Sequence, residues 1–260
     1  MQFEHLVDRQ EIWSSVEKYL IFLRSMKAYD LAAQYATNKT VLDFGCGAGY
    51  GAYYIAQVAA SVSAVDVDPK VINYAADKYK ADNLKFNVID EKLRPRSTKF
   101  DVITCFQVIE HIPDSEIGMF FEQIKRSMGE GGIALFSTPN KRIRLLPFQR
   151  PWHPDHKKEY TTGELHKLVS QHFKSVVVGG ITSRHDIIRL EKRRVRRAAL
   201  AVLARRILSG KTYDRLRSLK NTTSEAGVKN WSQSYSLADF VFRLSLPDKE
   251  VLDIVAIAKS

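Results

Sequence analysis

The sequence predicts an α/β fold, a doubly wound and mostly parallel sheet of seven strands with a helical insertion before the last strand. Two observations predict this fold. Short apolar runs of strand length alternate along the chain with longer segments of helical periodicity. The first of these runs also enters a glycine-rich turn that leads into a helical pattern, as at the start of nucleotide-binding sheets.

Proline and glycine residues indicate where several of the expected helices begin and end. Pro69 suits the first turn of one helix, and Gly129 and Gly131 are expected to end another. An N-terminal helical cap is expected within 1–36, the sheet domain within 37–182 and 239–260, and a basic helical insertion at 183–238. Strands are expected at 40–44, 62–66, 84–89, 100–105, 132–137, 176–180 and 251–258, and helices near 9–36, 51–59, 70–80 and 115–127.

Composition excludes several classes of protein. The chain has 260 residues, of which 45% are hydrophobic and 27% charged, as is ordinary for a soluble globular protein. The apolar run at 198–204 is far too short to span a membrane, and the first residues lack a secretory signal pattern. Two cysteines, Cys46 and Cys105, cannot form a disulfide framework. We therefore expect a cytoplasmic protein whose two thiols are buried and reduced.

The positive charge is concentrated in the insertion. Of the net charge of +11, most lies between Arg184 and Lys220, where 13 Lys or Arg stand against 3 Asp or Glu. A helix is expected here, ending near Gly210, with an apolar face formed by Val195, Ala199, Val202 and Leu203. Such a helix could cap a pocket, lie on an anionic membrane or bind nucleic acid. The last is disfavoured because aromatic residues do not interleave with the basic ones.

The spacing of the glycines in the turn indicates which kind of nucleotide it binds. Its glycines stand at alternate positions from Gly45 to Gly51, preceded by Asp43. The dinucleotide fingerprint would need a third glycine at position 50, which is Tyr50. The register therefore disfavours a nicotinamide-dependent oxidoreductase.

Acidic residues follow the second and third expected strands. Asp66 stands where a carboxylate can accept both ribose hydroxyls of a nucleoside, whereas Asp68 fits a helix cap. Asp90 could accept from an adenine amino group or be a solvated strand-end acid.

Five segments in order and register make a family resemblance specific. They resemble the class I S-adenosylmethionine-dependent methyltransferases, most of all the branch acting on small molecules, quinone precursors and glycan or lipid intermediates. The resemblance covers 39–180 and the last strand, and it implies a Rossmann-like methyltransferase fold whose final strand inserts antiparallel. The segments are VLDFGCGAGYG, AVDVDP, FDVITCFQVIEHIPD, GGIALFSTPN and HPDHKKEYTTGEL.

The resemblance also implies a cofactor, S-adenosyl-L-methionine, and residues to hold it. Asp43, Gly45 and Gly47 would line its methionine end, and Gln107 would lie beside its amino-acid portion. Asp66 would hold the ribose, Val67 would pack on the adenine ring, and Asp90 would bind the adenine amine. Tyr19 and Tyr29 are candidates to close over the cofactor, the alternative being plain helix packing.

Three histidines are candidate catalytic residues. His111 would lie at the mouth of the pocket, and His153 and His156 belong to the loop expected to shape the acceptor site. A neutral imidazole can remove a proton at physiological pH, although each histidine could instead be a structural anchor. Relatives with Glu-x-x-Glu-His are proposed to bind a divalent cation. Here Gln107 replaces the first carboxylate, so we expect no metal, although His153 or His156 could still complete a site.

The expected function is methyl transfer from S-adenosylmethionine, most often onto oxygen of a small-molecule, glycan or lipid-linked acceptor. Residues 184–220 would allow peripheral contact with an anionic membrane. The alternatives are an RNA methyltransferase that uses the basic insertion and a non-catalytic methyltransferase-like binding protein. The sequence names neither the acceptor nor the oligomeric state, because fold and cofactor do not fix function.

Overall fold

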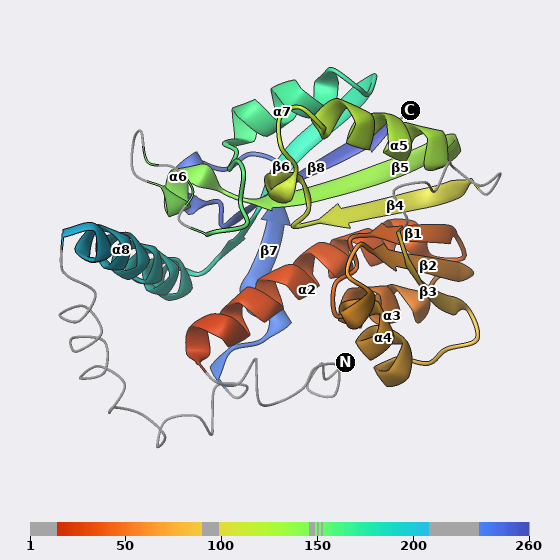
Figure 1. Ribbon diagram of the computed structural model, residues 1–260, viewed down its shortest axis with the longest axis horizontal. Coiled ribbons are helices and arrows are strands. Elements are labelled where there is room, and N and C mark those ends of the chain that lie inside the picture. The colour runs from red at the N-terminus through yellow and green to blue at the C-terminus, as the bar shows by residue number, and fades with distance from the viewer. Residues whose placement is uncertain are drawn as a thin grey trace.

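An eight-stranded sheet forms the centre of the computed structural model, which describes residues 15–89, 99–145, 149, 151, 153–207 and 234–259; the side chains of 199 and 201–207 are left undescribed (Figure 1). The strand order is β3-β2-β1-β4-β5-β8-β6-β7. The strands are β1 Thr40–Phe44, β2 Ser61–Asp66, β3 Leu84–Val88, β4 Phe100–Phe106, β5 Met128–Pro139, β6 Ser175–Ser183, β7 Phe240–Arg243 and β8 Asp253–Lys259.

Seven α-helices are described, and local caps explain where several of them begin. The Asp68 side chain accepts from the Lys70 amide at the start of α4, and Thr161 and Glu164 form a capping box on α7. The helices are α2 Val16–Ala36, α3 Tyr50–Ala56, α4 Pro69–Lys78, α5 Ile117–Ser127, α6 Lys141–Arg144, α7 Thr162–Ser170 and α8 His185–Ile207, with the short 3₁₀ turns η1 Ile109–His111, η3 Leu237–Asp239 and η4 Asp248–Glu250.

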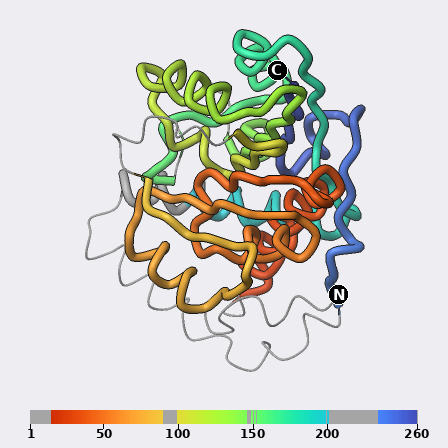
Figure 2. Tube along the Cα trace, turned by 90° about the vertical axis from the view of Figure 1, so that its right-hand side faces the viewer, coloured from red at the N-terminus to blue at the C-terminus, as the bar shows by residue number. Residues whose placement is uncertain are grey.

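Helices cover both faces of the sheet. Successive strand residues point to opposite faces, so Val41 joins the hydrophobic cluster of α2, α3 and α4, whereas Leu42 joins that of α5 and α7. In Figure 2, α3 and α4 (orange) lie on the opposite side of the molecule from α5 (yellow-green). Within the described residues, none of these helices is both long enough and apolar enough to cross a membrane.

The expected fold class is confirmed, with one correction to the number of strands. β1 to β5 are parallel, and β8 inserts antiparallel between β5 and β6, as the resemblance implied. The sheet has eight strands rather than seven because β7 pairs with β6 at the outer edge. β7 has only four residues, Phe240–Arg243, and although their burial alternates, so short a run carries little strand signal in the sequence.

Two further element boundaries differ from expectation. Gly129 and Gly131 do not terminate α5, and they do not form a turn. They lie inside β5, where the register against β4 shifts between Phe100 and Val102. Gly131 has a φ of 66°, which is typical of an irregularity that glycine tolerates within a strand. The N-terminal helix is described from Val16, so the expected segment at 9–14 lies outside the described residues.

Buried ion pairs join three elements beneath the sheet edge. Arg24 of α2 lies 2.6 Å from Asp253 of β8 and 3.2 Å from Glu191 of α8, measured between the charged atoms. Arg194 binds Glu191 from within α8 at 2.6 Å. Ile187, Ile188 and Val195 are buried on the same helix, so α8 packs on the body of the protein as well as carrying exposed charge.

We predict that Arg24→Ala destabilises the fold strongly. It leaves the buried Asp253 carboxylate without its ion-pair partner and Glu191 with Arg194 alone, a change that lowers the free energy of unfolding by about 3–5 kcal/mol. Lys27→Ala is the matched control, because Lys27 forms only a partly exposed pair with Asp30 on the same helix, worth about 0–1 kcal/mol. Urea titration followed by circular dichroism measures both; equal effects of the two substitutions would contradict the prediction.

Candidate active site

The carboxyl ends of the parallel strands meet at one edge of the sheet. The pairing of Phe44 with Val65 and of Cys105 with Phe136 brings the ends of β1, β2, β4 and β5 to this edge. β8 begins here as well, since Asp253 pairs with Pro139. Ligands bind at such an edge in doubly wound folds, and the residues singled out in the sequence follow these strand ends.

Three glycines of the turn after β1 have a positive φ: 80° at Gly45, 51° at Gly47 and 82° at Gly49. They differ in whether a side chain or open space lies beside them. A Cβ at Gly45 would overlap the side chain of Val108, whereas a Cβ at Gly47 would meet no atom within 4 Å. Gly47 is therefore the glycine beside which a ligand can approach the backbone.

Asp66 ends β2 with its carboxylate against this turn. One oxygen accepts from the Gly47 amide at 2.9 Å and the other from the Asp68 amide at 3.1 Å. A carboxylate has about four lone-pair positions, so two of them remain for further donors. Val67 follows with 72% of its surface exposed, unusual for an apolar side chain, and it lies beside the open turn. Asp90 lies outside the described residues.

Asp43 is fully buried below the turn and is held by protein donors. The Thr104 hydroxyl donates to its carboxyl at 2.7 Å and the Tyr29 hydroxyl at 3.2 Å. Burial raises the pKa of Asp43 to about 7. These contacts explain how Asp43 supports the turn, and its predicted contact with the cofactor stays a prediction.

Both candidate lid tyrosines are buried. The Tyr29 ring occupies the space where a Cβ on Gly51 would lie, and the Tyr19 hydroxyl donates to the Tyr235 carbonyl at 3.2 Å. These contacts fit helix packing, which was the alternative expectation for both residues.

Gln107 has a strained backbone at the end of β4. Its φ is 58°, a value that among the described non-glycine residues only Asn38 shares. Its amide donates to the Ser137 carbonyl at 2.9 Å, and its side chain donates to the Ser137 hydroxyl at 3.3 Å. Such strain concentrates at ligand-binding positions, and here it turns the chain from β4 into η1.

The three predicted histidines come together. The ring centroids of His111 and His156 are 4.8 Å apart, those of His153 and His156 are 4.4 Å apart, and those of His111 and His153 are 6.3 Å apart. Burial and the neighbouring His156 lower the pKa of His111, and the same causes lower the pKa of His153. Both imidazoles are therefore neutral near pH 7.

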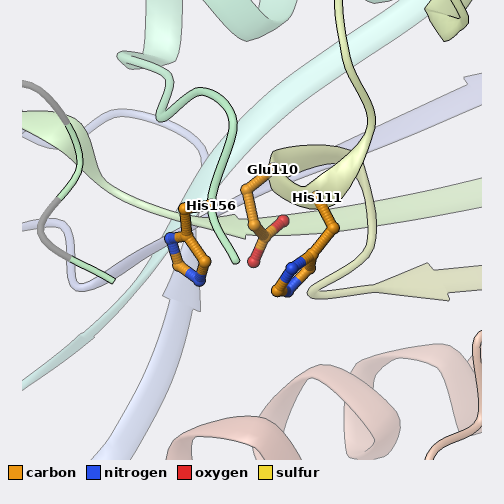
Figure 3. Close-up of side chains that lie close together, drawn as sticks. All are labelled: Glu110, His111 and His156. Carbon is orange, nitrogen blue, oxygen red and sulfur yellow. The ribbon is translucent and has the colours of Figure 1, made fainter. Parts of the chain in front are cut away.

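Glu110 lies fully buried next to these histidines (Figure 3). One carboxyl oxygen accepts from the Thr138 hydroxyl at 3.0 Å, and the other has no hydrogen-bond partner. Burial raises the pKa of Glu110 to about 8. Its backbone carbonyl accepts from the Lys157 amide at 2.7 Å and the Lys158 amide at 3.2 Å, which ties the segment carrying His156 to η1.

Sequence reasoning missed the charged residues behind the histidines. Glu159 accepts from His156 Nδ1 at 2.9 Å, and Arg144 Nε lies 3.1 Å from the same carboxylate oxygen. Arg144 and Glu159 are buried, as are Arg24 and Asp253 of the ion pair described above. These residues are scattered from α2 to β8, and no local pattern in the sequence connects them.

The chain belongs to a family whose model is described as a methyltransferase domain and which matches residues 23–233. It is 33% identical over 165 residues to a probable S-adenosylmethionine-dependent methyltransferase of Mycolicibacterium smegmatis, covering 63% of each chain. It is 29% identical to a ubiquinone biosynthesis O-methyltransferase of Colwellia psychrerythraea, over 40% of this chain and 43% of the relative. The chain thus spans less than two thirds of these curated relatives.

Solved structures support the same fold. An S-adenosylmethionine-dependent methyltransferase of Mesorhizobium loti superposes with a TM-score of 0.56 and 12% identity, over 93% of this chain and all of the other. At this identity the likeness shows the fold alone, and function must be argued from the site.

We predict that Asp43→Asn stabilises the protein more at pH 8 than at pH 5. The raised pKa means that the folded state holds a proton that the unfolded state releases between about pH 4 and 7. The wild-type free energy of unfolding therefore falls across this window, by an amount on the order of a few kcal/mol, and the neutral variant escapes this loss.

Urea unfolding at the two pH values measures the effect. Asp101→Asn is the control: hydrogen bonds from Thr40 lower the pKa of Asp101, so it is ionised at both pH values. A difference between wild type and Asp43→Asn that does not change with pH would refute the assignment.

Proposed function

We propose that the chain is an S-adenosylmethionine-dependent methyltransferase that methylates an oxygen atom of a small-molecule, glycan or lipid-linked acceptor. The observation that carries this proposal is the open backbone at Gly47, with the Asp66 carboxylate hydrogen-bonded to it and the exposed Val67 beside it. In a chain of the methyltransferase-domain family, this arrangement fits a nucleoside with a charged amino-acid tail.

The cofactor residues have separate tasks. Asp66 would accept the ribose hydroxyls with its two remaining lone-pair positions, and Val67 would cover the adenine ring. Gly47 would leave room for the methionine end, and Gly45, packed against Val108, would shape the turn that lines it, with Asp43 holding the turn from below. Gln107 would lie beside the amino-acid portion, and Asp90, beyond the described residues, keeps its proposed contact with the adenine amine.

Acceptor activation is assigned to the histidines. When bound, S-adenosylmethionine supplies an activated methyl group. The protein must orient the acceptor hydroxyl, exclude water and receive the proton, and the imidazoles of His111, His153 and His156 lie together for the last of these tasks. The name of the Colwellia psychrerythraea relative supports an oxygen acceptor.

The described part of the basic insertion supports a cap over the acceptor side. Ile187, Ile188 and Glu191 anchor α8 to the body, while Arg189, Arg193 and Arg196 are exposed along one stripe that continues to Leu200. A basic stripe ending in an exposed leucine suits contact with an anionic membrane, so acceptors presented on a lipid surface belong among the candidates.

We predict that Asp66→Asn weakens binding of S-adenosylhomocysteine by about 10- to 100-fold, because hydrogen bonds to a charged group are each worth about 1.5–3 kcal/mol. Isothermal titration calorimetry measures the affinity. Asp77→Asn, an exposed position on α4, is the control and leaves the affinity unchanged. No binding of the nucleoside by the wild-type protein would refute the proposed function.

We predict that His111→Ala and His156→Ala each lower the rate of methyl transfer by about 100-fold or more while nucleoside affinity stays the same, as expected for groups that act on the acceptor. Label from S-adenosylmethionine is followed onto phenols, sugars, lipid-linked acceptors on anionic vesicles, and RNA. His166→Ala, exposed on α7, is the control. Label on RNA alone would favour the alternative acceptor, and nucleoside binding without label on any acceptor would favour a non-catalytic binding protein.

A further inference from the structure

Three side chains at the acceptor end of the site form a set of metal ligands. Glu110, His111 and His156 each offer one ligand atom, and these atoms all lie within 4.8 Å of one another. Figure 3 shows the Glu110 carboxyl group between the two imidazole rings. Bonds from zinc to nitrogen or oxygen are about 2.0–2.2 Å, so two ligands of one ion lie at most about 4.4 Å apart. A small movement of the exposed His111 closes this gap.

The histidines are already held in the orientation that a metal needs. His156 Nδ1 donates to the Glu159 carboxylate at 2.9 Å, and His111 Nδ1 donates to the Asp155 carbonyl at 3.3 Å. Because both acceptors lack a hydrogen to give, Nδ1 carries the proton in each ring and Nε2 presents its lone pair. Metal-bound histidines have this type of outer partner, a carboxylate or a backbone carbonyl.

The carboxylate supplies a second and independent observation. Glu110 is fully buried, yet one of its oxygens has no hydrogen-bond partner. An unsatisfied oxygen in such a place is unfavourable unless a cation or a donor occupies the space in front of it. Its other oxygen is fixed by Thr138, so the unpartnered oxygen has one defined direction.

We propose that Glu110, His111 and His156 bind one divalent first-row transition ion, such as Zn²⁺, Mn²⁺ or Co²⁺, in preference to Mg²⁺. Two imidazoles and one carboxylate suit these ions, whereas Mg²⁺ prefers an all-oxygen shell. The proposed set does not include Gln107, whose side-chain nitrogen donates to the Ser137 hydroxyl. The sequence predicts no metal because Gln107 stands where relatives have a carboxylate; in the proposed set His156 is the third ligand.

Three protein ligands leave positions open for a substrate oxygen. A bound ion would supply Lewis-acid polarisation of an acceptor hydroxyl, a role that rests on the proposed methyl transfer. With the ion bound, His111 and His156 would be its ligands, and His153 would be the histidine that remains to receive the acceptor proton. Metal binding itself does not depend on that reaction, so it can be tested without it.

The test is a titration of the chelator-treated 260-residue chain with Co²⁺, followed by its visible absorption, and with Zn²⁺ in competition with a chromophoric chelator. We expect one equivalent bound by the wild type in the presence of millimolar Mg²⁺. Glu110→Gln and His156→Ala should lower the affinity by more than about 100-fold, and Glu159→Gln by about 10- to 100-fold, as is typical of outer partners. His166→Ala should bind like the wild type.

Glu110→Gln separates this proposal from a purely structural role. The amide keeps the Thr138 hydrogen bond and removes a buried carboxylate, so the metal-free variant should unfold at the same or a higher urea concentration than the metal-free wild type while losing the ion. Wild type that binds no ion, or variants that bind it equally well, would overturn the proposal. Calorimetry with S-adenosylhomocysteine is run in parallel, so that loss of the metal site and loss of the cofactor site are distinguished.

Discussion

The close approach between the turn after β1 and the two strands beside it governs the site. Gly45 passes the side chain of Val108 at a distance that leaves no space for a Cβ, and Gly47 is held by the carboxylate that ends β2. The parallel pairing of β1 with β2 and β4 fixes these distances. The backbone of the turn is therefore already ordered before a ligand binds. Ligand binding then does not bear the entropic cost of ordering this backbone.

Sequence patterns predicted the parts of the fold that depend on local order. The apolar runs of β1 to β4 and the punctuation by Asp68 and Pro69 were sufficient to place those strands and α4. They were insufficient for β7, whose four residues pair at the sheet edge only because β6 is there. The glycines within β5 looked like a turn because an irregular strand and a turn make the same demand on φ.

The candidate site also has parts that are local in sequence and parts that depend on long-range contacts. Asp66 and the glycine turn are local features, and the structure places them together at the sheet edge. The convergence of His111 with His156 depends on backbone hydrogen bonds from residues 157 and 158 to Glu110, which no spacing rule encodes. The Arg24, Glu191 and Asp253 cluster likewise brings together residues from the first and last described elements. Long-range buried charge of this kind is specified by the folded state as a whole.

The position of β8 makes the order of assembly matter. β6 and β7 have no hydrogen-bonded neighbour in the rest of the sheet until β8 lies between β5 and β6. The Asn140 side chain also donates to the Val251 and Asp248 carbonyls, and Arg24 finds Asp253 only in the docked strand. Without β8 in place, the sheet would therefore lack the connection from β5 to β6 as well as the Arg24–Asp253 ion pair. Because this strand makes the least local pairing in the sheet, we expect it to join the sheet late in folding.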